Sequence, residues 1–154
     1  MALQDTLIIK NNLTPKQTSY IDRIRKNAPV RSVRATRSHG VVKYVSLKMG
    51  KTIDCESRGL EHPGAIKKET DSDTCEYFFQ PDIAKIENKK TSDTKRPKIT
   101  HTPDVFSLTA NGPLMEELKF SDKLEKLHRA EPWKISKDED GRYRNLAAEE
   151  YYEK

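Results

Sequence analysis

Two acidic residues and one lysine form the part of the sequence best suited to chemistry. Asp104 follows Pro103 at the start of an expected strand, where proline is tolerated because it need not donate a hydrogen bond. Glu117 and Lys119 stand two residues apart on the expected partner strand, so both side chains should point to the same face of the sheet. Two carboxylates and an ammonium group would then share one small volume.

Oxygen ligands of this kind suit Mg²⁺, which keeps several of its waters and needs few protein ligands, and Mn²⁺ should substitute for it. A cation held by Asp104 and Glu117 would support phosphodiester hydrolysis, because it neutralises the phosphate and lowers the pKa of a bound water. Lys119 would orient that water or help to deprotonate it, since a nearby cation lowers a lysine pKa. An ordinary surface hairpin with a cross-strand ion pair would show the same pattern.

The hairpin that carries these residues is predicted from its turn. Asn111-Gly112 is a strong hairpin signal between a strand over residues 99–110 and a returning strand, Leu114–Lys119. The other expected elements are a helix from Thr14-Pro15 to Pro29, a strand over 41–47 with a turn at 49–51, a helix over 53–70 kinked near Pro63, strands over 77–79 and 83–86, a polar loop over 87–97, and helices from Ser121 to Ala130 and over 146–153. This order predicts one small α/β domain whose mixed β-sheet is flanked by helices.

Composition excludes several classes of protein. The 154 residues contain no apolar run long enough to cross a membrane, and the first residues lack the pattern of a secretory signal. The only cysteines, Cys55 and Cys75, exclude a disulfide scaffold and an ordinary structural zinc site. These features are typical of a soluble protein from a reducing compartment.

Charge divides the chain unevenly. Residues 1–51 hold 11 Lys and Arg against two Asp, whereas residues 52–154 hold 18 basic and 22 acidic residues. This pattern predicts a basic arm over 1–39, with a short helix, before a domain over 40–154 that is mildly acidic from residue 52 onward, and it favours a polyanion such as DNA over an acidic protein as the partner. The expected DNA contacts are Arg31, Arg34, Arg37, Lys43, Lys48 and Lys51.

A longer series of motifs adds a family resemblance. Residues 46–82 and 101–108, with the segments that follow, resemble the TnsA-type endonuclease subunit of heteromeric cut-and-paste transposases, which has the PD-(D/E)XK pattern. The resemblance covers about residues 40–133. Its motifs are Lys48-Met49-Gly50-Lys51, Glu56-Ser57, Leu60-Glu61, Gln80-Pro81, His101-Thr-Pro-Asp104, Glu117-x-Lys119 and Lys123-Leu-Glu-Lys-Leu127.

The resemblance implies a restriction-endonuclease-like fold and a Mg²⁺-dependent enzyme that cuts one strand, on the 5′ side, at transposon ends. It assigns Glu61 as the helix glutamate, Asp104 as the metal-binding aspartate and Lys119 as the catalytic lysine. Glu117 takes the position two before the lysine, and the carbonyl of Leu118 would complete the metal shell. Implied partners are double-stranded DNA, a DDE-type transposase and an AAA+ ATPase regulator, in the bacterial cytoplasm and at the nucleoid when active.

Two glutamates compete for the helix position. Glu56 and Glu61 would lie about 140° apart on a regular helix and could not share one site. The spacing to Gln80 favours Glu61, with Glu56 as the alternative, and Gln80 should support the sheet or contact phosphate. Pro63-Gly64 departs from the family pattern within this helix.

Other interpretations stay open at this stage. The chain could be a stand-alone restriction or repair nuclease, or a basic DNA-binding assembly subunit without catalysis. The family pattern ordinarily continues beyond residue 154 into another strand and often a partner-binding domain. A compact variant, an early end, or a sheet completed by a neighbouring chain would each explain the difference.

Overall fold

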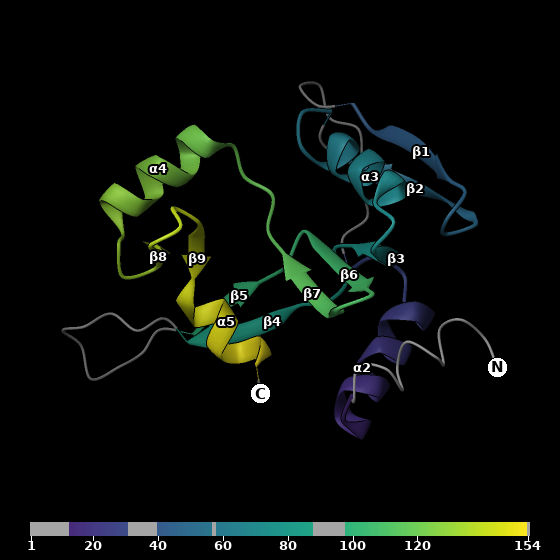
Figure 1. The fold of residues 1–154 in the computed structure, drawn as a ribbon, viewed down its shortest axis with the longest axis horizontal. Coiled ribbons are helices and arrows are strands. Elements are labelled where there is room, and N and C mark those ends of the chain that lie inside the picture. The colour runs from purple at the N-terminus through teal and green to yellow at the C-terminus, as the bar shows by residue number, and fades with distance from the viewer. Residues whose placement is uncertain (1–12, 31–39, 57, 88–97, 154) are drawn as a thin grey trace. The chain divides into compact units, whose positions relative to one another are not determined.

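The computed structural model describes residues 13–30, 40–56, 58–87 and 98–153. These residues form four helices and nine strands, which confirms the predicted combination of helix and sheet (Figure 1). Every strand pair among them is antiparallel, so the mixed sheet expected from the sequence is not found in this part of the chain. The predicted polar loop at 88–97 and the arginine-rich segment at 31–39 lie outside the described residues.

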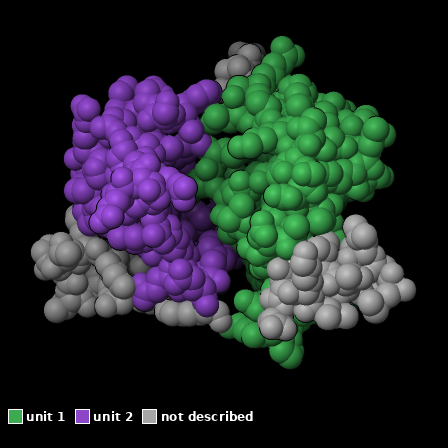
Figure 2. All heavy atoms as spheres, viewed as in Figure 1, with its two compact units in different colours: residues 1–82, 103–118 green, residues 83–102, 119–154 purple. Residues whose placement is uncertain are grey.

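The chain divides into two compact units, coloured separately in Figure 2. Unit 1 comprises Met1–Asp82 and Pro103–Leu118, and unit 2 comprises Ile83–Thr102 and Lys119–Lys154. Asp104 and Glu61 therefore belong to unit 1, whereas Lys119 is the first residue of the second segment of unit 2.

A three-stranded antiparallel sheet forms the centre of unit 1. Its strands are β3 (Thr74–Phe79), β6 (Val105–Thr109) and β7 (Gly112–Glu116), in the order β3-β6-β7. The predicted hairpin is confirmed, but its turn residues are Ala110 and Asn111, and Gly112, at a φ of 121°, is already the first residue of β7 and pairs with Thr109. Because neighbouring side chains alternate between the two faces, Tyr77 and Phe79 enter one core cluster and Phe78 enters the other.

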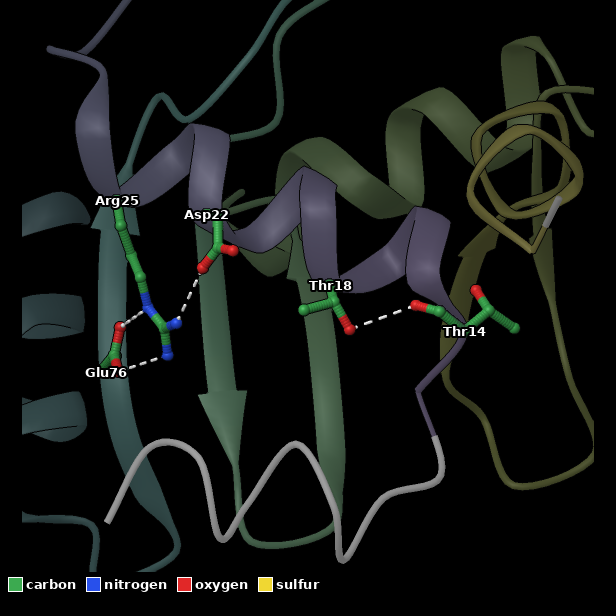
Figure 3. A network of polar contacts seen from close by, with 5 residues as sticks. All are labelled: Thr14, Thr18, Asp22, Arg25 and Glu76. Carbon is green, nitrogen blue, oxygen red and sulfur yellow. Dashed lines mark hydrogen bonds and ion pairs between the residues drawn. The ribbon is translucent and has the colours of Figure 1, made fainter. Parts of the chain in front are cut away.

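Helix α2 (Pro15–Lys26) covers one face of this sheet, and it confirms the predicted first helix. Thr14 and Gln17 form a capping box at its start, with proline in the first turn. Ile21 and Ile24 are buried against Phe106 and Leu108. Near the end of the helix, the guanidinium of Arg25 binds both carboxylate oxygens of Glu76, at 2.9 and 2.8 Å, and a carboxylate oxygen of Asp22 (Figure 3).

A hairpin and a second helix cover the opposite face. Strands β1 (Val42–Ser46) and β2 (Lys51–Cys55) pair across a turn that contains Gly50 at a φ of 62°. Helix α3 (Glu61–Thr70) lies beside them in Figure 1. Ile53 and Cys55 of β2 pack with Ala65 of α3 against Tyr77 and Val105 of the sheet.

The predicted helix over 53–70 with a kink at Pro63 is wrong in its first part. Ile53 and Cys55 are the buried residues of β2, so the apolar spacing that suggested a helix combines a strand with a later helix. Pro63 falls in the first turn of α3, where the missing N–H needs no intrahelical partner, and the helix continues to Thr70.

The predicted strands of the catalytic hairpin are also shorter than expected. Residues 99–110 form two strands, β5 (Lys98–His101) and β6, separated at the buried Pro103. The returning strand ends at Glu116 rather than Lys119. Pro103 has no N–H to extend the ladder beyond Asp104, so pairing stops there.

Unit 2 contains two small hairpins and two helices. Its elements are β4 (Ala84–Glu87) paired with β5, α4 (Ser121–Ala130), β8 (Ile135–Lys137) paired with β9 (Tyr143–Asn145), and α5 (Leu146–Tyr152). Ala84, Ile86 and Ala148 form its buried cluster. The strand predicted at 83–86 and the helices predicted from Ser121 to Ala130 and over 146–153 are thereby confirmed, whereas β8 and β9 were not predicted. Within the described parts of both units, every helix is too short or too polar to cross a membrane.

Candidate active site

Asp104 stands at the open end of the β6–β7 hairpin, directly before β6. Its N–H donates to the carbonyl of Glu116 at 3.1 Å, which is the last backbone bond of the hairpin. Its carboxylate oxygen Oδ2 accepts the N–H of Leu118 at 2.7 Å. The aspartate therefore fixes the chain just after β7, and it is held in place by that contact.

Glu61 begins helix α3, and its side chain is buried, with 7% of the residue exposed. Its carboxylate accepts the backbone N–H of Glu56 and the side-chain amide of Gln80, the latter at 3.4 Å. Burial raises the pKa of Glu61 above its ordinary range. The two hydrogen bonds lower this pKa and the carboxylates of Glu56 and Asp104 raise it, and the net shift is upward. Glu61 and Asp104 thus come from separate parts of unit 1 and lie near enough for the charge of Asp104 to raise the pKa of Glu61.

Gln80 links the two carboxylate-bearing segments. Its N–H donates to the carbonyl of Asp104 at 2.9 Å, and its own carbonyl accepts the N–H of Val30 at 3.1 Å. Its φ is +47°, the only positive φ at a residue other than glycine among those described. Such a backbone conformation is unfavourable for a glutamine and persists only where the surroundings enforce it.

Leu118 packs helix α3 against the segment after β7. A Cβ atom at Gly64 would lie 3.1 Å from a methyl carbon of Leu118, which is closer than side chains usually approach. Glycine at this position therefore allows the first turn of α3, which carries Glu61, to lie against the chain that Asp104 holds. This contact gives a physical reason for the glycine in the Pro63-Gly64 departure.

Glu117 and Lys119 lie beyond the end of β7. The Glu117 side chain is exposed, and that of Lys119 is partly buried. The expectation that both point to one face relied on a strand reaching Lys119, so strand alternation no longer supports it. Leu118, whose N–H binds Asp104, directly precedes Lys119 in the chain.

The structure favours Glu61 over Glu56 for a different reason than the sequence did. Glu56 follows β2 and precedes α3, so the two glutamates do not lie on one helix and the 140° argument does not apply. Its N–H binds the Glu61 carboxylate, and its own carboxylate contributes to the raised pKa of Glu61. Glu61 is the buried partner of Gln80, as its spacing to that residue suggested.

The residues around Glu61 fit a hard divalent cation with few protein ligands. The described residues contain no group of three or more His, Cys, Asp or Glu side chains that could hold a metal ion. They do provide two mutually repelling carboxylates and a buried amide oxygen, Oε1 of Gln80, which has no hydrogen-bond partner among them. Mg²⁺ and Mn²⁺ accept such oxygens and keep water in the remaining positions.

Sequence reasoning missed a second polar cluster near the hairpin. The ammonium of Lys68 forms a salt bridge with Glu116, whose carboxylate also accepts the hydroxyl of Ser107 at 3.0 Å. Lys68 and Ser107 are buried. The helical spacing from Glu61 to Lys68 placed both on one face of α3, and this was the available signal.

Of the basic residues predicted to contact DNA, Arg31, Arg34 and Arg37 lie outside the described residues. Lys43 pairs with Asp54 at 2.9 Å on the exposed side of the β1–β2 hairpin. Lys51 lies over the ring of Phe78, with 4.7 Å between its nitrogen and the ring centroid. Lys48 donates to the carbonyls of Lys68 and Asp71 at the end of α3, so its ammonium group stabilises that helix end.

No protein-family model matches this chain, and no curated protein matches it. The function is therefore inferred from the residues gathered around Glu61 and from the motif series. Three features carry most weight in that inference: the burial of Glu61, its contact with Gln80, and the proximity of Asp104.

Proposed function

We propose that this chain is a divalent-cation-dependent DNA endonuclease of the PD-(D/E)XK type. In this proposal it is the subunit of a heteromeric transposase that cuts one strand, on the 5′ side, at transposon ends. A single observation supports the chemistry best. The carboxylate of Glu61, at the start of a helix, is close enough to that of Asp104, at the open end of a hairpin, for the two charges to repel one another, and a metal-dependent phosphodiesterase needs such a pair.

The arrangement around Asp104 is consistent with a restriction-endonuclease-like core. An antiparallel sheet presents the aspartate before one strand and the Glu-x-Lys segment after the next, while a helix supplies a glutamate from one face. The described strands form small separate sheets, so the likeness is strongest in the three-stranded sheet of unit 1. We propose this core for unit 1.

The residues of the chain have distinct roles in the proposed reaction. Mg²⁺, when bound, would supply a Lewis acid for the phosphate and a more acidic water. Asp104 and Glu61 would hold the cation, and the carbonyl of Leu118 would be fixed near it because the Leu118 N–H binds Asp104. Lys119, the next residue, would orient the attacking water or stabilise charge on the phosphate, with Glu117 as a further oxygen ligand.

Burial explains why the cation would matter for Glu61. A carboxylate that is removed from water and faces another carboxylate is unfavourable in its ionised form, and its pKa rises. A divalent cation removes that penalty, since it attracts both carboxylates. The same residues are therefore a poor structural ion cluster and a good cation site.

Specificity would come from outside this site. DNA would be held through its phosphates by the basic arm and by Lys43 and Lys51 of the β1–β2 hairpin, whereas the Lys48 ammonium is engaged at the end of α3. Target choice would fall to a DDE-type transposase that joins the other strand, with an AAA+ ATPase as regulator. These partners rest on the motif resemblance.

A reconstituted cleavage assay tests the proposal. The full chain is combined with the candidate transposase and DNA that carries transposon ends, and nicking is followed strand by strand with Mg²⁺, Mn²⁺ or EDTA. We expect one nick at each end that needs the divalent cation and is lost in Asp104→Ala, while DNA binding is retained. Retained binding without any cation-dependent nick in the wild type would instead support a non-catalytic assembly subunit.

A cleavage assay with the isolated chain would distinguish a transposase subunit from a stand-alone nuclease. A stand-alone restriction or repair nuclease should cut DNA without the transposase. The transposase subunit should cut efficiently only with its partner.

A further inference from the structure

Gln80 has an environment that its role in the sheet does not explain. It is 2% exposed, yet its Oε1 accepts no hydrogen bond from the described residues. A buried carbonyl oxygen without a partner is unfavourable in folded proteins, and such groups are rare. The backbone at the same residue is held at a positive φ of 47°. Two unfavourable features therefore coincide at one residue beside the carboxylates.

The orientation of the Gln80 amide is set by its neighbour. Its nitrogen Nε2 faces the carboxylate of Glu61 at 3.4 Å, and the opposite orientation would bring two oxygens together. A separation of 3.4 Å is long for a hydrogen bond, so this contact holds the side chain only weakly. Oε1, on the same amide group as Nε2, is thereby left close to the Glu61 carboxylate with its lone pairs available.

We propose that Gln80 is a ligand of the divalent cation, with Oε1 as a neutral third oxygen beside the carboxylates of Glu61 and Asp104. This inference rests on the proposed function, since the cation is the one that the nuclease would use. Amide oxygens are ordinary ligands of hard cations. A neutral ligand also avoids a third negative charge in a place where two carboxylates already repel one another.

The backbone hydrogen bonds of Gln80 also support a role in cation binding. Its N–H binds the Asp104 carbonyl at 2.9 Å, and its carbonyl accepts the Val30 N–H at 3.1 Å, so both backbone groups are fixed. These bonds hold the residue between Asp104 and Glu61 despite the strained φ. The strain is consistent with a residue retained for binding, because glycine would adopt the same backbone without steric strain.

Binding of Mn²⁺ to the full chain tests this assignment without any cleavage. Free Mn²⁺ is measured by its electron paramagnetic resonance signal during titration of the wild type, Gln80→Leu, Gln80→Gly and Gln80→Glu. We expect Leu and Gly to weaken Mn²⁺ binding by about tenfold to a hundredfold, the range seen when groups that support a metal site are removed. Glu should bind Mn²⁺ at least as tightly as the wild type, because it keeps an oxygen and adds charge.

The glutamate variant separates a ligand from a positioning residue. Glutamate cannot donate to Glu61, so if Gln80 served only to hold Glu61, the Glu and Leu variants would lose Mn²⁺ affinity equally, and that result would overturn the proposal. The glycine variant separates binding from folding. It keeps the backbone bonds and relieves the positive φ, so its thermal unfolding temperature should stay the same or rise while its Mn²⁺ affinity falls.

Gln17→Leu is the matched control. Gln17 is a glutamine of the same unit, in the capping box of α2 on the opposite face of the sheet from α3, and its replacement should leave Mn²⁺ affinity unchanged. Asp104→Asn distinguishes the two proposals. If the wild type binds no Mn²⁺, the proposed function fails. If Asp104→Asn abolishes binding but Gln80→Leu does not weaken it, only the role of Gln80 is refuted.

Discussion

Helix α3 places one glutamate near each end, and the two have opposite electrostatic environments. Glu69, in the last turn, accepts hydrogen bonds from the Ser46 hydroxyl at 2.6 Å, the Lys48 N–H at 2.7 Å and the Tyr77 hydroxyl at 2.8 Å. Burial tends to raise its pKa, but these bonds outweigh burial and lower it. Glu61, in the first turn, has fewer donors and two acidic neighbours, and its pKa is raised.

The helix dipole alone would give the reverse result. A carboxylate is favoured at the N-terminus and disfavoured at the C-terminus, by about 0.3–1 kcal/mol. Hydrogen bonds to a charged group contribute about 1.5–3 kcal/mol each, so the local donors decide the outcome. The comparison teaches that Glu69 is satisfied by the fold, whereas Glu61 is not and would gain from a cation.

Removal of the partner carboxylate at the Glu61 end should have the largest effect. In Asp104→Asn we expect strand cleavage to fall by at least the roughly 10²–10³-fold that loss of one electrostatic stabiliser costs. The variant should fold normally, because asparagine keeps an oxygen to accept the Leu118 N–H. Rates are measured in the reconstituted assay, with thermal unfolding as the control. Undiminished cleavage would remove Asp104 from the reaction.

Loss of the Glu69 charge, in the last turn of α3, should reduce the stability of the fold rather than cleavage. Glu69→Gln keeps one acceptor oxygen but must present an NH₂ group to one of the donors, so we expect the free energy of unfolding to fall by about 1–3 kcal/mol. The measurement is urea denaturation followed by circular dichroism. Mn²⁺ affinity of the folded variant should not change, and a marked loss of affinity would mean that the two ends of α3 are not separate in function.

The same substitution at Glu61 should act in the opposite direction. Glu61→Gln removes a buried charge that faces Asp104, so without divalent cation the free energy of unfolding should rise by about 1 kcal/mol. Mn²⁺ should no longer stabilise the variant as it does the wild type. Denaturation with and without Mn²⁺ measures both effects. Destabilisation in EDTA as large as that of Glu69→Gln would show that Glu61 is a structural residue.

The smallest effect concerns pH. The lowered pKa of Glu69 means that its contribution to stability is present above the ordinary glutamate pKa of 4.5 and is lost as the pH falls through the lowered value. The raised pKa of Glu61 means that its contribution is full below 4.5 and is lost as the pH rises through the raised value. Stability of Glu69→Gln should therefore vary less on the acid side, and that of Glu61→Gln less on the neutral side. Denaturation across this pH range in EDTA checks both slopes.

Much of the fold could be predicted because the signals were local. The Thr14-Pro15 helix start, the Asn111-Gly112 hairpin signal and the start of α4 at Ser121 each depend on neighbouring residues. The region over 53–70 was mistaken because Ile53 belongs to a strand whose partner lies earlier in the chain. Burial of Ile53 against Tyr77 and Val105, which are distant in the sequence, is also part of that strand's environment and could not be seen from local spacing.

The candidate site was predictable in its residue types and less so in its geometry. Motif spacing selected Glu61, Gln80 and Asp104, which the structure brings together. It could not show that Pro103 ends the ladder and that the Asp104 side chain then takes the Leu118 N–H. Nor could spacing reveal the positive φ of Gln80 or its buried oxygen, since both result from packing of distant segments.

Iron-directed backbone cleavage would show whether the cation binds at the Glu61 end or at the Glu69 end of α3. Fe²⁺ replaces Mg²⁺ in the full chain, and ascorbate with peroxide then generates hydroxyl radicals that cut the polypeptide close to the bound ion. The account predicts fragments that end near Glu61, Gln80 and Asp104, which excess Mg²⁺ suppresses and Asp104→Asn abolishes. Cuts centred on Glu69, or cuts spread along the chain regardless of Mg²⁺, would contradict it.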